Sequence, residues 1–389
     1  MCKYKKSLCI ISVACSSIIL FFCTYFIVLG GDLNQLLNNV DVKLANEMIK
    51  LNSANSTLLD KFFNIISNSG LNIHYIIISI LTLICENVRI AISIYFALSF
   101  PVLTITVYFV LRKMNISILS SYMISLIVPF FPYRIMRGGI QIPVGFFIMA
   151  PLTMYCVWLI GQGNNKEYSP NGLQTIFFFT VCSFPFFSIE YSYMSLILLI
   201  FAIIFSGRKF TYKFKVKLIF ILIIGMLLTL LIDLKFSNEK IFDSSNIYLN
   251  IVNAKAGSLK FVQLILPIIN HRIKPFADMR NYYDDSFAAY GENGLCSLGI
   301  FFAFSLLLSL FMLFFIKKNF SDFLKKIYFG GIINLFIIFL ASEGGFGVWL
   351  TLIGVNIKQY NHMYAFLLIN ICIITGFIFD KIFSNKFYI

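Results

Sequence analysis

The residues of this chain that could do chemistry are charged groups bordering long apolar segments. Asp32 follows the first such segment directly, after Gly30 and Gly31, which permit a tight backbone reversal. A carboxylate held there could accept a proton from an attacking hydroxyl. Glu47 and Asp60 are the alternative carboxylates of the same segment. The competing interpretation is that Asp32 only ends a helix in the solvated headgroup region.

Basic residues stand at two places where a phosphate could be bound. Arg134 and Arg137 close an apolar segment, and His271 and Arg272 follow another apolar run. Guanidinium groups bind phosphate with well-aligned hydrogen bonds, which favours recognition of a phosphorylated headgroup. Snorkelling of the same side chains to membrane lipid remains the alternative for the arginines.

Aromatic and acidic residues near these cations could contact a sugar. They are Tyr282, Tyr283 and Glu292, together with Glu343 before a glycine-rich loop. Tyrosine rings stack on sugar faces and donate hydrogen bonds, although an aromatic belt at the membrane interface gives the same pattern.

Other chemistries lack their motifs. The sequence has neither a phosphate-binding Gly-Lys-Ser/Thr loop nor a dinucleotide fingerprint, so a nucleotide is not expected as direct substrate. Its three histidines and nine cysteines show no metal-ligand spacing, and we expect no metal and no cofactor.

The elements that must position these residues are membrane helices. The 389 residues are 59% hydrophobic and 12% charged, with a mean hydropathy of +0.86. This composition is typical of a polytopic membrane protein and excludes disorder and a soluble core. Apolar runs predict ten transmembrane helices in an all-α protein. The predicted spans are 7–29, 90–111, 114–132, 142–161, 173–188, 192–206, 217–233, 295–316, 327–341 and 362–379.

The basic residues orient this scheme. With both termini in the cytoplasm, the inner segments carry the whole formal excess of +14, as the positive-inside rule expects. The charge therefore needs no nucleic-acid partner. Residues 1–389 form one membrane domain with two large outer loops, about 30–89 and 234–294, and the first loop is expected to hold short interfacial helices. The apolar run 73–85 is either re-entrant or spanning, and its 13 residues favour the former.

Several segments together resemble bacterial membrane glycosyltransferases of the GT-C type, and among them the serotype-converting O-antigen glucosyltransferases. The segments are 87–113, 128–139 (VPFFPYRIMRGG), 142–152, the set His271–Arg272, Tyr282 and Gly291–Glu292, and the pair 344–347 (GGFG) and 358–363 (KQYNHM). The resemblance covers most of the chain as pattern and order, with Gln141 where a histidine would be expected. It implies a GT-C fold and a proton-accepting role for Asp32.

The resemblance also implies the reaction. A sugar, expected to be glucose, would move from a polyprenyl-phosphate carrier to O-antigen or a related surface polysaccharide, at the periplasmic face of the bacterial inner membrane. A flippase and a carrier-charging glycosyltransferase would supply the lipid-linked donor. Two alternatives stay open: a polysaccharide polymerase, and a transporter that flips the lipid-linked sugar.

Overall fold

The computed structural model describes most of the chain. The described residues are 2–23, 71–162, 170–206, 210–236, 247–268, 271–286, 292–315, 320–352, 357 and 359–384. Within these ranges the protein is helical, and its one β contact is an isolated parallel bridge between Leu259 and Ser342.

The described helices follow one another with short connections. The longer ones are α1 (Cys2–Cys23), α5 (Ile73–Cys85), α6 (Val88–Lys113), α7 (Ile118–Ile127), α10 (Met149–Gln162), α11 (Pro170–Phe187), α12 (Ile189–Phe205), α13 (Tyr212–Phe236), α16 (Lys274–Ser286), α17 (Gly299–Phe311), α18 (Asp322–Ala341) and α20 (Tyr364–Ser384). The shorter ones are η2 (Val128–Phe130), α8 (Pro132–Ile140), α9 (Ile142–Gly145), α14 (Ile247–Ala256), α15 (Phe261–Ile265), η4 (Glu292–Leu295), η5 (Met312–Phe314), α19 (Phe346–Leu352) and η7 (Tyr360–Met363).

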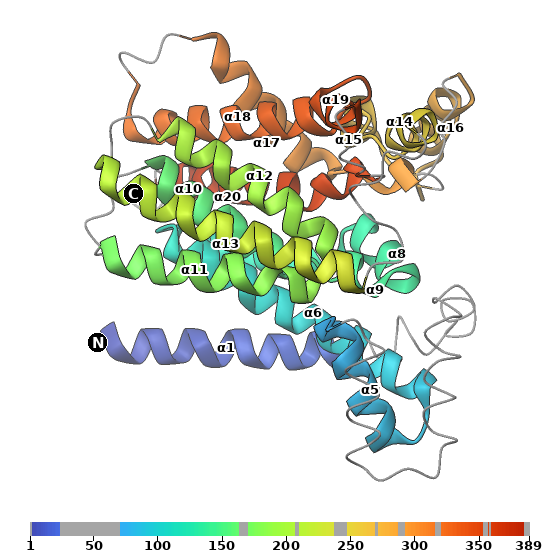
Figure 1. Ribbon diagram of the computed structural model, residues 1–389. Helices are drawn as coiled ribbons and strands as arrows, with labels where there is room; N and C mark the ends of the chain where they lie inside the picture. Colours follow the sequence, from blue (N-terminus) through green and yellow to red (C-terminus); the bar gives the residue numbers. More distant parts are fainter. Residues whose placement is uncertain are drawn as a thin grey trace.

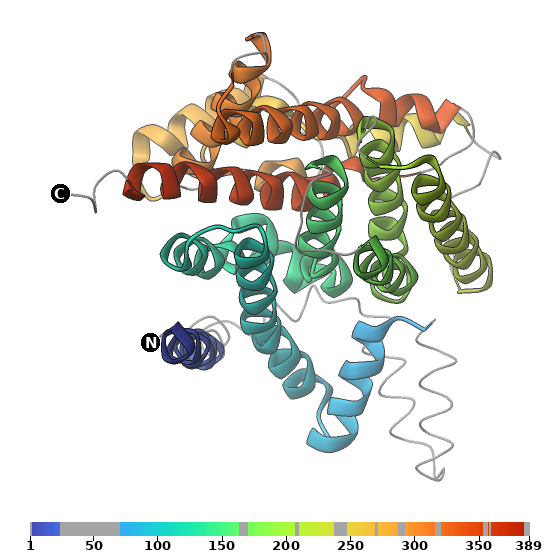
Figure 2. The same ribbon diagram turned by 90° about the vertical axis from the view of Figure 1, so that its left-hand side faces the viewer.

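The long helices form a bundle with two distinct ends. Helix α1 begins and α20 ends at the same end of the bundle (Figure 1), as an even number of membrane crossings requires. Helices α8, α9, α14, α15, α16 and α19 lie at the opposite end, which we call the distal end (Figure 1). Figure 2, viewed from the end where the chain begins, shows α1 at the edge of the bundle, where it packs against α6.

Five helical stretches are long and apolar enough to cross a membrane, judged by length and composition. They are Val88–Lys113, Ile142–Gln162, Tyr212–Lys235, Asp322–Ala341 and Tyr360–Phe383. Shorter apolar helices cover the predicted spans 114–132, 173–188, 192–206 and 295–316, and α1 covers most of 7–29. The architecture is therefore compatible with the expected all-α membrane protein.

Helix α5 corresponds to the apolar run 73–85 and ends sharply. Its 13 residues extend about 20 Å at 1.5 Å per residue, which is less than the hydrocarbon core of a bilayer. Glu86 ends it in the left-handed conformation, with φ 54°, and the chain reverses into α6. The length favours the re-entrant interpretation of this run.

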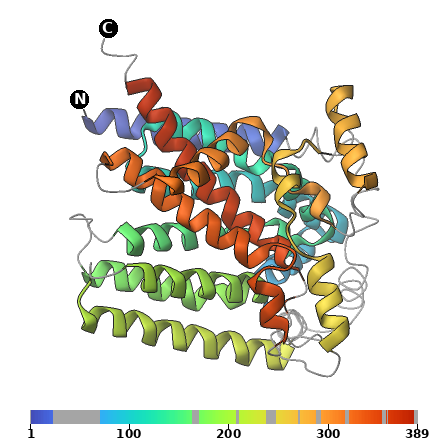
Figure 3. The same ribbon diagram turned by 90° about the horizontal axis from the view of Figure 1, so that it is seen from above.

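Helix α20 occupies the centre of the bundle. Its residues from Tyr364 to Phe377 are buried, and it packs against α6, α7, α10, α17 and α18. Figure 3 shows α18 and α20 inclined to the direction of α11 and α13. Close approach of α17 and α18 depends on Gly331, because a Cβ at this position would collide with the carbonyl oxygen of Ser309.

The second predicted loop, 234–294, contributes short helices to the distal end. Its backbone is tied to the end of α18, because the Leu259 amide donates to the Ala341 carbonyl at 2.8 Å. The Gly257 carbonyl accepts a hydrogen bond from the Asn361 amide at 2.7 Å. These bonds place α14 and α15 beside the segment that leads into α20.

Candidate functional site

Helix α8 carries both predicted arginines at the distal end, and two prolines fix its position. Phe131 is extended, as expected for a residue before proline, and Pro132 occupies the first helical turn. The helix stops at Gln141, which is also extended, and α9 restarts with Pro143 in its first turn. The short helix thus places Arg134 and Arg137 on a rigid segment between two breaks.

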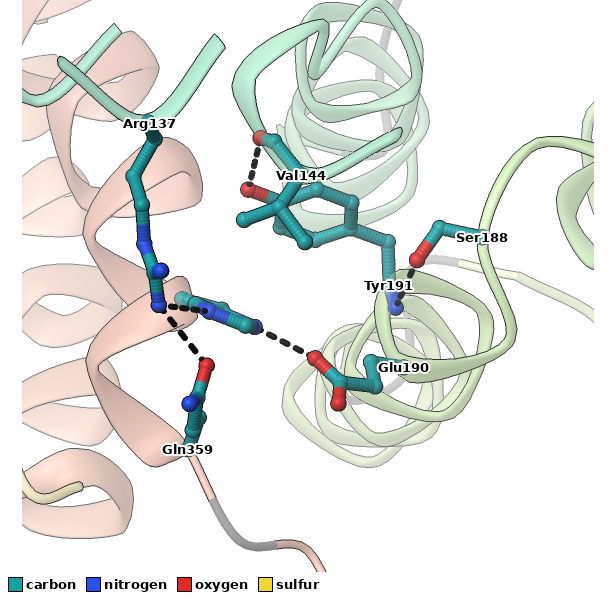
Figure 4. Close-up of polar contacts among 7 residues, drawn as sticks. Arg137, Val144, Ser188, Glu190, Tyr191 and Gln359 are labelled. Atoms are coloured by element: carbon teal, nitrogen blue, oxygen red, sulfur yellow. Dashed lines mark hydrogen bonds and ion pairs between the residues drawn. The ribbon is translucent and has the colours of Figure 1, made fainter. Parts of the chain in front are cut away.

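Arg137 is the first member of a chain of polar contacts that crosses the distal end (Figure 4). Its Nη2 donates to Gln359 Oε1 at 2.8 Å and lies 3.2 Å from His362 Nε2. The other ring nitrogen, His362 Nδ1, lies 2.5 Å from Glu190 Oε2. We call Arg137, His362 and Glu190 the relay cluster.

The contacts of the relay cluster define the state of its histidine. A guanidinium group only donates hydrogen bonds, so Nε2 of His362 must accept from Arg137. An ionised carboxylate only accepts, so Nδ1 carries the hydrogen and donates to Glu190. His362 is therefore a neutral imidazole with both nitrogens engaged, and it orients the Glu190 carboxylate.

The turn that carries Glu190 is itself anchored. Ser188 caps α12, because its Oγ accepts from the Tyr191 amide at 3.4 Å, and the Tyr191 hydroxyl donates to the Val144 carbonyl at 2.8 Å (Figure 4). Asn72 at the start of α5 donates to the Phe187 carbonyl at 3.2 Å. Helices α5, α9, α12 and η7 thus converge on one turn, and Glu190 in the first turn of α12 is favoured by the helix dipole.

Arg134 lies beside the relay cluster in a different environment. It is 1% exposed, donates to Ser99 Oγ, and its guanidinium carbon lies 4.5 Å from the Phe100 ring centroid and 5.2 Å from that of Phe96. Within the described ranges its Nε and Nη1 have no hydrogen-bond partner and it makes no ion pair. Burial lowers the pKa of Arg134 to about 9, against the opposing influence of Tyr95 and Tyr191, so it stays charged at neutral pH.

His74 lines the same region and is also uncharged. Its Nδ1 lies 2.5 Å from the Tyr95 hydroxyl, and its ring packs edge-on against Phe146 and Phe187. Burial, and secondarily the charge of Arg134, lowers the pKa of His74 to about 3. A neutral histidine avoids a second buried positive charge beside Arg134.

A third buried arginine at the distal end was not anticipated from the sequence. Arg280 is fully buried on α16, where its Nε donates to Asp284 Oδ2 at 2.8 Å and its Nη1 donates to the Pro267 carbonyl at 3.0 Å. Unlike Arg134, it has a carboxylate partner, which indicates a structural role in holding α16 against the chain after α15.

The other predicted site residues lie apart from α8. His271 makes local contacts only: its Nδ1 accepts from the Ile273 amide, and its ring packs against Phe276. Arg272 is exposed. Neither makes a hydrogen bond with a described residue of α8, so a phosphate site shared with Arg134 and Arg137 stays a prediction.

The predicted sugar contacts are accessible. Tyr282 is 78% exposed, Tyr283 is half-buried, and Glu343 is exposed in the turn after α18. Glu292 begins η4, and its side chain lies outside what the structure describes. The predicted proton acceptor Asp32 and its alternatives Glu47 and Asp60 also lie outside the described residues.

Sequence reasoning missed the relay cluster as a unit. Glu190 was noted only as part of an interfacial turn, and His362 only as part of the entry into the last span. A carboxylate at the end of an apolar run was the available signal. The pairing itself was hidden, because 172 residues separate Glu190 from His362.

No metal centre is evident in the part of the chain that the structure describes, where no group of three or more His, Cys, Asp or Glu residues could hold an ion. Neither a family model, nor a curated protein, nor a solved structure matches this chain. The functional argument therefore rests on the residues of the distal end.

Proposed function

We propose that this protein is a ten-span membrane glycosyltransferase with a GT-C-like fold, which transfers a sugar from a polyprenyl-phosphate carrier to a surface polysaccharide. The observation that supports this proposal is the charge of Arg134. Its guanidinium is buried at the distal end, and the described residues provide no anion to balance it.

A buried charge without a counter-ion is unfavourable unless something balances it. A phosphate would supply both negative charge and hydrogen-bond acceptors for Nε and Nη1 of Arg134. The group lies against Phe96 and Phe100 of α6, with Phe21 of α1 packed on the same rings. An anion reaching this position next to apolar helices is best supplied by a lipid, whose chain would lie along them.

The chemistry follows from this placement. A sugar bonded to the lipid phosphate would have its anomeric carbon next to the distal surface, and the phosphate would be the leaving group. Arg134 would stabilise the negative charge that develops on that phosphate as the bond to the sugar breaks. The resemblance to serotype-converting enzymes suggests glucose as the sugar and O-antigen or a related glycan as acceptor.

The same proposal gives the protein a cellular place. The distal end would face the periplasm from the bacterial inner membrane, and a flippase and a carrier-charging glycosyltransferase would deliver the donor. Asp32, just after the first apolar segment, remains the proton acceptor predicted from the sequence.

The decisive experiment is structural analysis of surface polysaccharide from an O-antigen-producing host with and without this gene. We expect a new monosaccharide branch with the wild-type gene. Arg134→Met should reduce branching by about 100-fold or more, as expected for loss of a group that stabilises the transition state. Arg89→Met is the matched control, because Arg89 is an exposed arginine on α6.

Other outcomes would contradict the proposal in distinct ways. Altered chain length without a new branch would indicate the polymerase. Unchanged glycan with redistributed carrier lipid would indicate the transporter. Full branching by Arg134→Met at normal protein level would remove the phosphate-binding role of Arg134.

A further inference from the structure

We infer that Glu190 is the proton acceptor for the attacking sugar hydroxyl, and that His362 and Arg137 are the residues that position it. This inference rests on the proposed function and concerns the same reaction. It assigns to the relay cluster the role that the sequence alone assigned to Asp32.

Exposure within the relay cluster runs in one direction. The Glu190 side chain is 39% exposed, whereas His362 is 1% exposed and Arg137 is fully buried. The carboxylate is therefore the only member of the three that an incoming hydroxyl could reach. The two buried members fix its orientation from behind, as a preorganised base requires.

The hydrogen bonds determine where a proton can go. Both nitrogens of His362 are engaged, Nε2 by Arg137 and Nδ1 by Glu190. Protonating Nε2 would break its contact with Arg137 and place two positive charges together. A proton taken from substrate thus stays on the Glu190 carboxylate.

The transfer step balances with this assignment. The acceptor hydroxyl gives its proton to Glu190 as its oxygen forms a bond to the anomeric carbon. The bond between that carbon and the carrier phosphate oxygen breaks, and its electron pair leaves with the phosphate. The products are the glycosylated acceptor, the free lipid phosphate and a protonated Glu190, which then returns its proton to water.

Tyr191 connects the carboxylate to the proposed phosphate site. It follows Glu190 in α12, its hydroxyl is held by the Val144 carbonyl, and its ring lies 6.0 Å from that of His362. It also interacts electrostatically with both Arg134 and Arg137. The base and the unpaired guanidinium thus border the same tyrosine, as a reaction between a hydroxyl and a phosphate-linked sugar needs.

The test uses the full-length protein in proteoliposomes with polyprenyl-phosphate glucose and an O-antigen acceptor. Glu190→Gln should lower the transfer rate by about 100-fold or more, in the range expected for loss of a general base. Stabilisation of the variant by undecaprenyl phosphate should match that of wild type. Glu86→Gln, which changes an exposed carboxylate at the end of α5, should leave the rate unchanged.

Two further variants separate chemistry from folding. Glu190→Asp keeps a carboxylate and should recover part of the rate lost in Glu190→Gln. His362→Phe keeps a ring but removes the donor to the carboxylate, so the acidic limb of the pH–rate profile should move to higher pH. The groups facing Glu190 in this experiment are His362, Arg137 and Tyr191.

Several results would overturn the inference. Glu190→Gln with a rate within about threefold of wild type would do so, as would loss of transfer in Asp32→Asn alone. Equal losses in Glu190→Gln and Glu190→Asp, with lipid phosphate still bound, would show a structural role. A wild-type protein that transfers no sugar would instead contradict the proposed function.

Discussion

Two buried polar clusters lie in this bundle, and they differ in how their hydrogen bonds are completed. In the middle of the bundle, Trp158 Nε1 donates to Asn370 Oδ1 at 2.8 Å, and Asn370 Nδ2 donates to Asn334 Oδ1 at 2.7 Å. Asn334 in turn donates to Ser309 Oγ, which donates to the Leu306 carbonyl. At the distal end, Arg134 has two nitrogens without a described partner.

The difference separates structural from functional polarity. The mid-bundle network joins α10, α17, α18 and α20 and satisfies itself, as polar groups at membrane depth must. The distal cluster keeps a charge that the described protein groups do not balance. Such an imbalance persists where a ligand supplies the missing partner. The predictions below test this contrast.

The largest effect should come from adding lipid phosphate. At about 100 times its dissociation constant, undecaprenyl phosphate should stabilise the wild-type protein by about 2.7 kcal/mol. Arg134→Met should lose this stabilisation, because the anion would have lost its partner. Thermal unfolding in detergent with and without the lipid measures both, and equal shifts in the two proteins would place the anion elsewhere.

The next effect concerns pH at His74. Its pKa of about 3 in the folded protein lies below the value near 6.5 expected when unfolded, so the unfolded state takes up protons first. Stability is thus fully present above pH 6.5 and falls as the pH drops toward 3, by about 2 kcal/mol at pH 5. Unfolding between pH 4 and 8 measures this, and His74→Phe should flatten the curve. An unchanged slope in the variant would show that another group titrates.

The smallest effect should come from the satisfied network. Asn370→Leu leaves Trp158 Nε1 and Asn334 Oδ1 without their partner, and we expect a loss of about 1 kcal/mol with normal transfer per folded molecule. Asn361→Leu is the matched control, because its buried side chain makes no hydrogen bond with the described residues. Equal losses in unfolding free energy would erase the distinction between the two asparagines.

Much of the architecture could be predicted from hydropathy, because a spanning helix must be apolar along its whole length. Each of the ten predicted spans overlaps a described helix, and the 13-residue run 73–85 is a separate short helix. Arg134 and Arg137 were also found from the sequence, because arginine at the end of an apolar run is rare enough to be noticed. The distance between the two arginines and His271 was not predictable.

The partners of these residues could not be predicted, for a physical reason. Which side chain faces another across a helix bundle depends on the rotation of each helix about its axis, and hydropathy carries little information about rotation when all faces are apolar. Glu190, Gln359 and His362 meet Arg137 only because α8, α12 and η7 pack at one end. Arg280 was read as part of a solvated loop, although it is fully buried.

The central position of α20 has a consequence for biogenesis. The ribosome makes this helix after every helix that it packs against, so α6, α10, α17 and α18 enter the membrane around a space that is still unfilled. Trp158 and Asn334 await their partner until Asn370 arrives. The segment just ahead of α20 carries His362, so the same insertion event closes the bundle and completes the relay cluster. A chain stalled before this segment would therefore be inactive, and quality control would meet it as an open bundle with exposed polar groups.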